Sequence, residues 1–114
     1  MNLLEETKQT LVMNDKSFDD VRWIGSRDGR MVISKENWVE RMNMTYGSGF
    51  GAQEICTDLV VVGDDWWLER HEYDGSEWWE FKTRPVLQGD AREVKKITGM
   101  WDRLEEVDED EDRD

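Results

Sequence analysis

The residues with the greatest capacity for chemistry lie close together in the middle of the chain. The stretch DDWWLERHE, residues 64–72, supplies two aspartates, two glutamates and the single histidine. If this stretch is a strand, Glu69 and His71 point to the same face and form a carboxylate–imidazole pair. A hydrolase would also need a nucleophile. The sole cysteine, Cys56 in EICTDLV, sits where a small buried apolar residue is expected. We predict that the protein is not an enzyme.

No metal or cofactor site is predicted. Asp64 and Asp65 could bind a hard cation, but the spacing of an EF-hand is absent. A single histidine argues against a zinc site built on histidines. The one glycine-rich stretch, TYGSGFGAQ, lacks the Gly-Lys-Ser/Thr ending and the preceding strand of a phosphate-binding loop. We interpret it as a flexible connection that carries Tyr46 and Phe50.

A tight turn determines how the central residues are arranged. Asp74-Gly75 is among the strongest short signals for a two-residue hairpin turn. It predicts strands over residues 66–73 and 76–83, the second of them ended by Pro85. A turn of known length also sets the register. The expected pairs are Tyr73 with Ser76, Glu72 with Glu77, His71 with Trp78, Arg70 with Trp79, Glu69 with Glu80, Leu68 with Phe81 and Trp67 with Lys82.

This register sorts the side chains onto two faces, because alternate residues of a strand point in opposite directions. One face is predicted to join the core, with Arg70 at its edge and stacked on Trp79; it collects Trp66, Leu68, Arg70, Trp79 and Phe81. The other face collects Trp67, Glu69, His71, Tyr73, Trp78, Glu80 and Lys82. Its opposed glutamates cost about 0.2–1 kcal/mol, and its aromatic surface is of the size and type that marks binding sites.

Three uses of this second face follow from the sequence. A helix could cover it, it could bind a protein, or it could be a platform for a small ligand such as a carbohydrate. For a protein partner, the aromatic side chains would provide anchors and the glutamates charge complementarity. The residues predicted to contact the partner are Trp67, Glu69, His71, Glu72, Tyr73, Glu77, Trp78 and Glu80.

Three helices are expected outside the hairpin. Asn2 is the predicted N-cap of a first helix that ends near Met13, with two glutamates in its first turn. Ser34 is expected to cap a short helix over residues 35–44. A third helix is predicted from about Asp90, because apolar residues follow at helical spacing; they are Val94, Ile97, Met100, Trp101 and Leu104.

Two further segments predict strands. Residues 21–33 read as a second hairpin around the turn SRDG, and the apolar run at residues 59–62 predicts a central strand covered on both faces. Together, the predicted helices and strands indicate an α+β fold, a small antiparallel sheet packed with about three helices. We expect a single domain over residues 1–104, followed by a disordered acidic tail over residues 105–114.

The chain is strongly acidic, and much of its charge lies at one end. Its 114 residues include 28 acidic and 15 basic ones, a net charge of −13. The last ten, EEVDEDEDRD, carry eight acids and one base. This tail is either a solubilising extension or a polyanion that docks on a basic partner. The acidic balance argues against direct binding of nucleic acid or of an anionic membrane surface.

Composition narrows the class of protein further. No run of about 18 apolar residues predicts a membrane span, and the N-terminal MNLLEETKQT lacks the features of a secretory signal. A single cysteine excludes an internal disulfide framework. Seven tryptophans offset the hydrophobic content of 37%, so a small compact core is expected. We expect a cytoplasmic protein.

The segment DLVVVGDDWWLERHEYDGSEWWEFKTRP, together with LLEETKQTL and DDVRWIGSRDG, resembles small uncharacterised proteins encoded by phages and prophages of Gram-positive bacteria. The paired tryptophans that flank YDGS are the specific part. The resemblance implies a small accessory phage protein in the cytoplasm of an infected bacterial host. Such proteins often inhibit host defence or modify host enzymes, and several anti-CRISPR proteins are similarly short and acidic.

These observations predict a non-catalytic phage accessory protein that binds and inhibits or modulates a host protein. The expected partner has a basic surface, as a CRISPR nuclease or another nucleic-acid enzyme does, and spaced carboxylates would take the place of phosphates in its groove. The alternative is a small-ligand or carbohydrate-binding module that uses a tryptophan platform.

Overall fold

The computed structural model describes residues 1–47 and 51–107. The chain divides into two compact units, Met1–Arg84 and Pro85–Asp114, and each is described by itself. The division falls before Pro85, well short of the predicted boundary at residue 104. Most of the predicted acidic tail, residues 108–114, lies outside the described residues.

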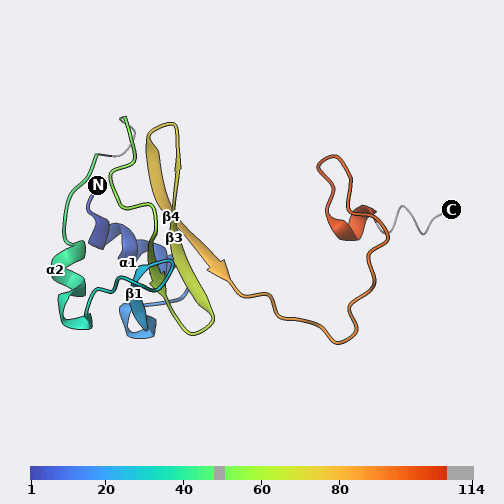
Figure 1. The fold of residues 1–114 in the computed structure, drawn as a ribbon, viewed down its shortest axis with the longest axis horizontal. Coiled ribbons are helices and arrows are strands. Elements are labelled where there is room, and N and C mark those ends of the chain that lie inside the picture. The colour runs from blue at the N-terminus through green and yellow to red at the C-terminus, as the bar shows by residue number, and fades with distance from the viewer. Residues whose placement is uncertain (48–50, 108–114) are drawn as a thin grey trace. The chain divides into compact units, whose positions relative to one another are not determined.

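A four-stranded antiparallel sheet organises the first unit (Figure 1). Its strands are β1 (Trp23–Ser26), β2 (Leu59–Val62), β3 (Trp66–Tyr73) and β4 (Ser76–Thr83), hydrogen-bonded in that order. The apolar run that predicted a central strand is β2. Its Val60 and Val61 point to opposite faces and are 4% and 0% exposed, so the strand is covered on both faces there. Helices pack on the sheet, and the α+β class is confirmed.

The β3–β4 hairpin has the predicted strands and the predicted register. Every expected pair is present, from Tyr73 with Ser76 at the turn outward. The turn residues Asp74 and Gly75 have φ angles of 51° and 84°. A type I′ turn needs positive φ at both central positions, and a two-residue loop leaves the strands no freedom to slip.

The two α-helices lie on one side of the sheet (Figure 1). Helix α1 (Leu3–Met13) begins after Asn2, whose side-chain oxygen accepts a hydrogen bond of 3.0 Å from the backbone N–H of Glu5. The predicted cap is therefore confirmed. Helix α2 (Trp38–Met42) is short, as expected.

Two short 3₁₀ turns complete the helical structure of this unit. They are η1 (Phe18–Asp20), which is closed by a capping box from Ser17, and η2 (Lys35–Asn37), which leads into α2. The expected cap at Ser34 is wrong in its detail, because its side chain makes no capping hydrogen bond. Ser34 precedes η2, whereas α2 itself begins at Trp38, after Asn37, and buries Trp38 and Met42 in the core.

The core fills the space between the helices and the sheet. Its fully buried side chains include Leu11 and Met42 from the helices and Ile24, Val61 and Leu68 from the strands. At the far end of the hairpin the rings of Trp66 and Phe81 stack with their centroids 5.7 Å apart. The face predicted to join the core therefore does so.

The second predicted hairpin is only partly formed. Residues 31–33 run alongside β1, but they make a single bridge, Gly25 with Val32, and no strand. The approach is close, since a Cβ on Gly25 would lie 2.1 Å from the carbonyl oxygen of Met31. The full ladder of β1 is instead with β2, whose apolar residues bury more surface.

The helix predicted from Asp90 is wrong for the described residues. Of residues 85–107, the part of the second unit that the structure describes, only 104–107 are helical. The apolar side chains that suggested the helix are largely exposed, with Ile97, Met100 and Trp101 at 81%, 84% and 95%. A helix of this length draws most of its stability from tertiary packing, and Gly99 lowers the helix propensity of the segment.

Candidate functional site

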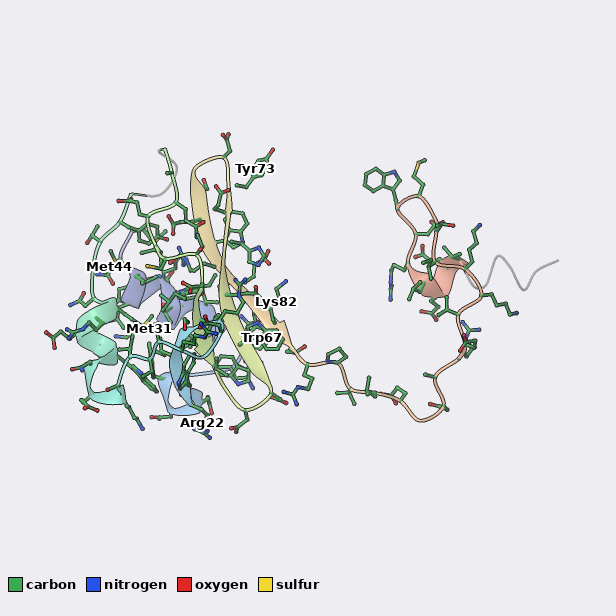
Figure 2. All side chains as sticks on the ribbon, in the orientation of Figure 1. Arg22, Met31, Met44, Trp67, Tyr73 and Lys82 are labelled. Carbon is green, nitrogen blue, oxygen red and sulfur yellow. The ribbon has the colours of Figure 1, made fainter. Side chains whose placement is uncertain are left out.

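One face of the sheet carries no helix among the described residues of the first unit, and we call it the open face. The pairing register places there Trp67, Glu69, His71 and Tyr73 from β3 and Trp78, Glu80 and Lys82 from β4. Figure 2 shows Trp67 and Lys82 projecting from the side of the sheet away from α1 and α2. The predicted second face of the hairpin is therefore assembled as a surface of the first unit.

Its aromatic side chains are not sealed inside that unit. Tyr73 is 77% exposed and Trp78 is 37% exposed, while Trp67 is partly exposed. Aromatic side chains at such positions are the kind that anchor protein interfaces. The open face is thus an amphipathic surface of the sheet.

The glutamates of the open face already have partners. The indole Nε1 of Trp67 donates a hydrogen bond of 2.8 Å to Glu69, and a guanidinium nitrogen of Arg27 lies 3.5 Å from the same carboxylate. Glu80 lies 2.9 Å from His71 Nε2 and 3.3 Å from Lys82 Nζ. The cations Arg27 and Lys82 offset the repulsion expected between the opposed glutamates, and these contacts leave few free carboxylates.

The histidine has the predicted carboxylate neighbours. His71 Nε2 lies 3.7 Å from Glu69 as well as close to Glu80; neither contact has hydrogen-bond geometry. Cys56 is exposed, which contradicts its prediction as a buried apolar residue. It stands in the loop before β2, beside residues 31–33. Among the described residues no cluster of three or more His, Cys, Asp or Glu could hold a metal ion.

A shallow groove of about 330 Å³ lies on the same face. Val60 and Val62 form its apolar floor, Trp67 stands beside it, and Arg27 and Glu69 supply the polar groups. The volume is at the low end for small-ligand sites. An aromatic ring flanked by a guanidinium and a carboxylate could stack on and hydrogen-bond to a polar ring such as a sugar.

Two predicted partner-binding residues are not on the open face. The register puts Glu72 and Glu77 on the helix-bearing side. Glu72 is exposed near the turn, whereas the side chain of Glu77 is fully buried. Glu77 therefore does not contribute to a docking surface, because burial leaves no part of it for a partner.

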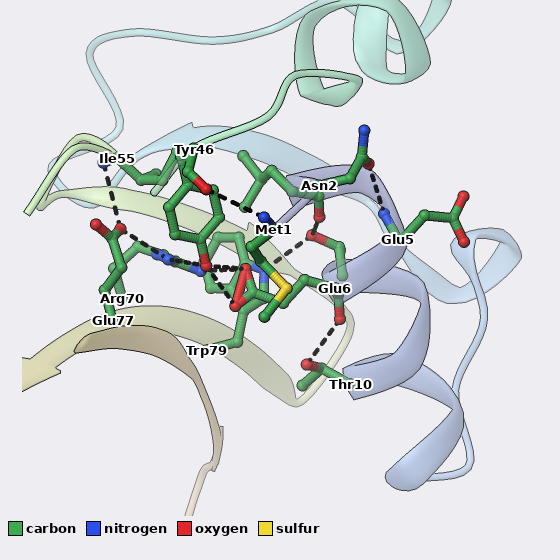
Figure 3. A network of polar contacts seen from close by, with 12 residues as sticks. Met1, Asn2, Glu5, Glu6, Thr10, Tyr46, Ile55, Arg70, Glu77 and Trp79 are labelled. Carbon is green, nitrogen blue, oxygen red and sulfur yellow. Dashed lines mark hydrogen bonds and ion pairs between the residues drawn. The ribbon is translucent and has the colours of Figure 1, made fainter. Parts of the chain in front are cut away.

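Glu77 belongs instead to a buried polar network centred on Arg70 (Figure 3). The Arg70 guanidinium donates to Glu77 at 2.8 Å, to Glu6 of α1 at 2.9 Å and to the Tyr46 hydroxyl at 3.2 Å. It also lies over the rings of Tyr46 and Trp79, 5.4 and 4.8 Å from their centroids. The predicted stacking on Trp79 is confirmed, but Arg70 lies inside the core and not at its edge.

The network shifts the pKa values of its members. Burial alone would raise the pKa of Glu77, but hydrogen bonds from Arg70 and from the backbone N–H groups of Glu54 and Ile55 outweigh it, so the pKa is lowered. Burial would likewise lower the pKa of Arg70, but its hydrogen bonds to Glu77, Tyr46 and Glu6 raise it. The guanidinium and the Glu77 carboxylate are therefore both charged at neutral pH.

Tyr46 is the member that the sequence did not predict. It stands in the glycine-rich stretch, which we interpreted as a connection, yet it is 3% exposed. Its hydroxyl lies 2.9 Å from both carboxylate oxygens of Glu6. Burial raises its pKa; the hydrogen bond with Arg70 opposes that effect and Glu6 adds to it. Phe50, the other aromatic residue of the stretch, lies outside the described residues.

Among the described residues, no helix is both long and apolar enough to cross a membrane. Comparison of the chain with protein-family models, with curated proteins and with solved structures gives no match.

Proposed function

We propose that this chain is a non-catalytic protein that binds and modulates a host protein through the open face of its sheet. The observation that carries the proposal is the group of exposed aromatic side chains, Tyr73 and Trp78 with Trp67 beside them, on a face that bears no helix of the first unit. Such side chains, held on strands, bury large areas at small entropic cost on binding.

The charge of the chain favours a basic partner. Residues 1–84 contain 17 acidic and 10 basic residues, a net charge of −7, and the exposed Glu72 and Asp74 border the open face at the turn. Because the glutamates of the face itself are paired, the aromatic residues would supply affinity, and the surrounding charge would steer association. An anti-defence protein of a phage, acting in the cytoplasm on a nuclease with a basic groove, fits this chemistry.

The test is affinity capture with the tagged full-length chain from a Gram-positive bacterial host. Trp78→Ser removes the aromatic anchor, which is 37% exposed, and Met13→Ser removes an apolar side chain at the end of α1 that is 82% exposed. A partner that is retained by the wild type and by Met13→Ser but lost by Trp78→Ser supports the proposal. Equal capture by all three chains, or no enriched protein, would overturn it.

The same capture tests the basic nature of the partner. Contacts between separated charges weaken when salt shortens the Debye length, which is about 8 Å at physiological ionic strength. Binding should therefore fall steeply between about 50 and about 500 mM salt. A complex that is unaffected over this range would reject charge mimicry while leaving the aromatic contact in place.

The groove beside Trp67 favours a second candidate, a carbohydrate-binding module. Its apolar floor, the indole and the Arg27–Glu69 pair provide stacking and hydrogen bonding at one place. Glucose, N-acetylglucosamine and their short oligomers would be titrated while tryptophan fluorescence is recorded. A saturable change that is lost in Trp67→Ala supports this candidate, and no change with any of these sugars rejects it.

A further inference from the structure

A pocket of about 310 Å³ lies where the paired ends of β1 and β2 meet residues 31–33 and the loop before β2. It shares no residue with the groove beside Trp67 or with strands β3 and β4. At about 30 Å³ per molecule, its volume equals that of about ten waters, which suits a small ligand. Its lining includes Met31, Val32, Ile33, Cys56, Asp58 and Leu59.

Backbone hydrogen bonds hold both sides of this pocket against β1. On one side, the N–H of Ser26 donates to the Met31 carbonyl at 2.8 Å. On the other side, the N–H of Arg27, directly after β1, donates to the Asp58 carbonyl at 2.8 Å. The fold of the first unit therefore builds the two sides of the pocket.

The apolar part of the lining is open to water. Met31 and Val32 are 71% and 60% exposed, and Ile33 and Leu59 are partly buried where they pack on the core. Such surface is removed from water when an apolar group enters the pocket, and this removal is favourable. The lining therefore favours a ligand with an apolar body.

Asp58 gives the pocket a preference for one sign of charge. It is exposed, and of the described residues that line the pocket it alone is charged. No ion pair or side-chain hydrogen bond joins its carboxylate to another residue that the structure describes. The neighbouring cation, Arg27, lies 3.5 Å from the carboxylate of Glu69 instead. An ammonium group would therefore meet an unpaired counter-charge here.

We propose that this pocket binds a small molecule that has an apolar body and a primary amine. The body lies against the apolar side chains of the lining, and the amine lies beside Asp58. An acid is repelled by Asp58 and by the net charge of −13, and a neutral molecule gains the apolar contact alone. The proposal does not depend on the proposed function, because the pocket lies apart from both the hairpin and the groove beside Trp67.

The thiol of Cys56 reports whether the pocket is filled. It belongs to the sole cysteine of the chain, which is exposed and lines the pocket. A bound ligand should slow its alkylation by iodoacetamide, which mass spectrometry of the intact chain follows. The probes are 2-phenylethylamine, 2-phenylethanol and phenylacetate, which share a ring and differ in charge. They are titrated to about 20 mM, because ligands this small bind weakly.

The three probes should differ in a fixed order. The amine should slow alkylation saturably, with half of the effect at about threefold lower concentration than the alcohol, because an exposed ion pair adds only modestly to affinity. Phenylacetate should have the weakest effect. No saturable slowing by the amine, or slowing by the alcohol or the acid at an equal or lower concentration, would overturn the proposal.

A matched pair of variants tests the partner of the amine. Asp58→Asn should remove the preference for the amine over the alcohol. Asp65→Asn makes the same change at an exposed position in the turn between β2 and β3, and it should keep the preference. A preference that survives in Asp58→Asn would exclude Asp58 as the partner of the amine, and the proposal with it.

A second pair tests where the apolar body lies. Val32→Ser should weaken the effect of both the amine and the alcohol, whereas Val39→Ser on α2 should change neither, although the two valines are 60% and 59% exposed. In an NMR titration with the amine, the amide signals of Val32 and Leu59 should shift. Equal binding by the two valine variants, or amide shifts confined to residues outside the pocket, would contradict the assignment.

Discussion

Arg70 and Glu77 form an ion pair of 2.8 Å in which neither side chain has any exposed surface. Arg70 lies on β3 and Glu77 on β4, and the same guanidinium reaches Glu6 on α1 at 2.9 Å. One buried cation therefore ties the hairpin to the helix. Its Nε is a buried nitrogen without a hydrogen-bond partner among the described residues. Arg70, Glu6 and Glu77 therefore depend on one another, because removing any one of these charges leaves a buried partner without its counter-charge.

Removing the cation should destabilise the protein strongly. Arg70→Met leaves the carboxylates of Glu6 and Glu77 buried without a counter-charge, which costs about 3–5 kcal/mol. The matched control is Lys82→Met, because Lys82 and Glu80 form a partly exposed ion pair that is worth about 0–1 kcal/mol. Urea unfolding followed by tryptophan fluorescence gives both free energies of unfolding. Similar losses in the two variants would contradict the role assigned to the buried pair.

Stability should fall in acid through Glu77. Hydrogen bonds from Arg70 and from the backbone hold its folded pKa below that of a free glutamate side chain. The charged form is therefore preferred in the folded state, and the stabilisation is fully present above the unfolded pKa. It is lost as the pH falls through the folded pKa, because the carboxylate must then be protonated.

The comparison with Glu77→Gln isolates this contribution. The difference in unfolding free energy between the wild type and Glu77→Gln should shrink as the pH is lowered from about 7 to about 3. Urea unfolding at several pH values measures it. A difference that does not vary with pH would show that Glu77 is not charged in the folded protein.

The hydroxyl of Tyr46 should contribute to stability although it stands in a glycine-rich stretch. Tyr46→Phe removes a group that lies between Glu6 and Arg70 and leaves their polar atoms less well satisfied. The expected loss is about 1–3 kcal/mol. Tyr73→Phe removes an exposed hydroxyl and should leave stability unchanged within about 0.5 kcal/mol. Thermal or urea unfolding of the two variants decides the matter, and an equal effect would place Tyr46 outside the network.

Adjacent tryptophans of β4 should respond in opposite ways to truncation. Trp79 is 6% exposed and its indole N–H donates to the Thr7 hydroxyl at 2.8 Å, so Trp79→Ala should cost about 3–5 kcal/mol. Trp78 lies on the open face, and Trp78→Ala should cost about 1 kcal/mol or less. Unfolding of the two variants tests the register of the hairpin directly. A larger loss at Trp78 than at Trp79 would mean that the strand is turned over.

The fold class and the central hairpin follow from the sequence because their causes are local. Asp74 and Gly75 accept positive φ and close a two-residue turn, and this turn sets each pair and each face of β3 and β4. Asn2 caps α1 through a residue three positions along the chain. The helix predicted from Asp90 depended on periodicity alone, and among the described residues of that segment only 104–107 are helical.

Only the tertiary structure decided where the charged and aromatic residues of the network lie. Glu6 and Arg70 are 64 residues apart, and Tyr46 is 40 residues from Glu6. No turn or periodicity encodes contacts at that separation. The alternation along β4 places Glu77 on the same face as Trp79, but a lone carboxylate is expected at the surface; Glu77 is buried because Arg70 neutralises it. Burial of a charge depends on which partner reaches it, and that is settled only when helix, loop and hairpin pack together.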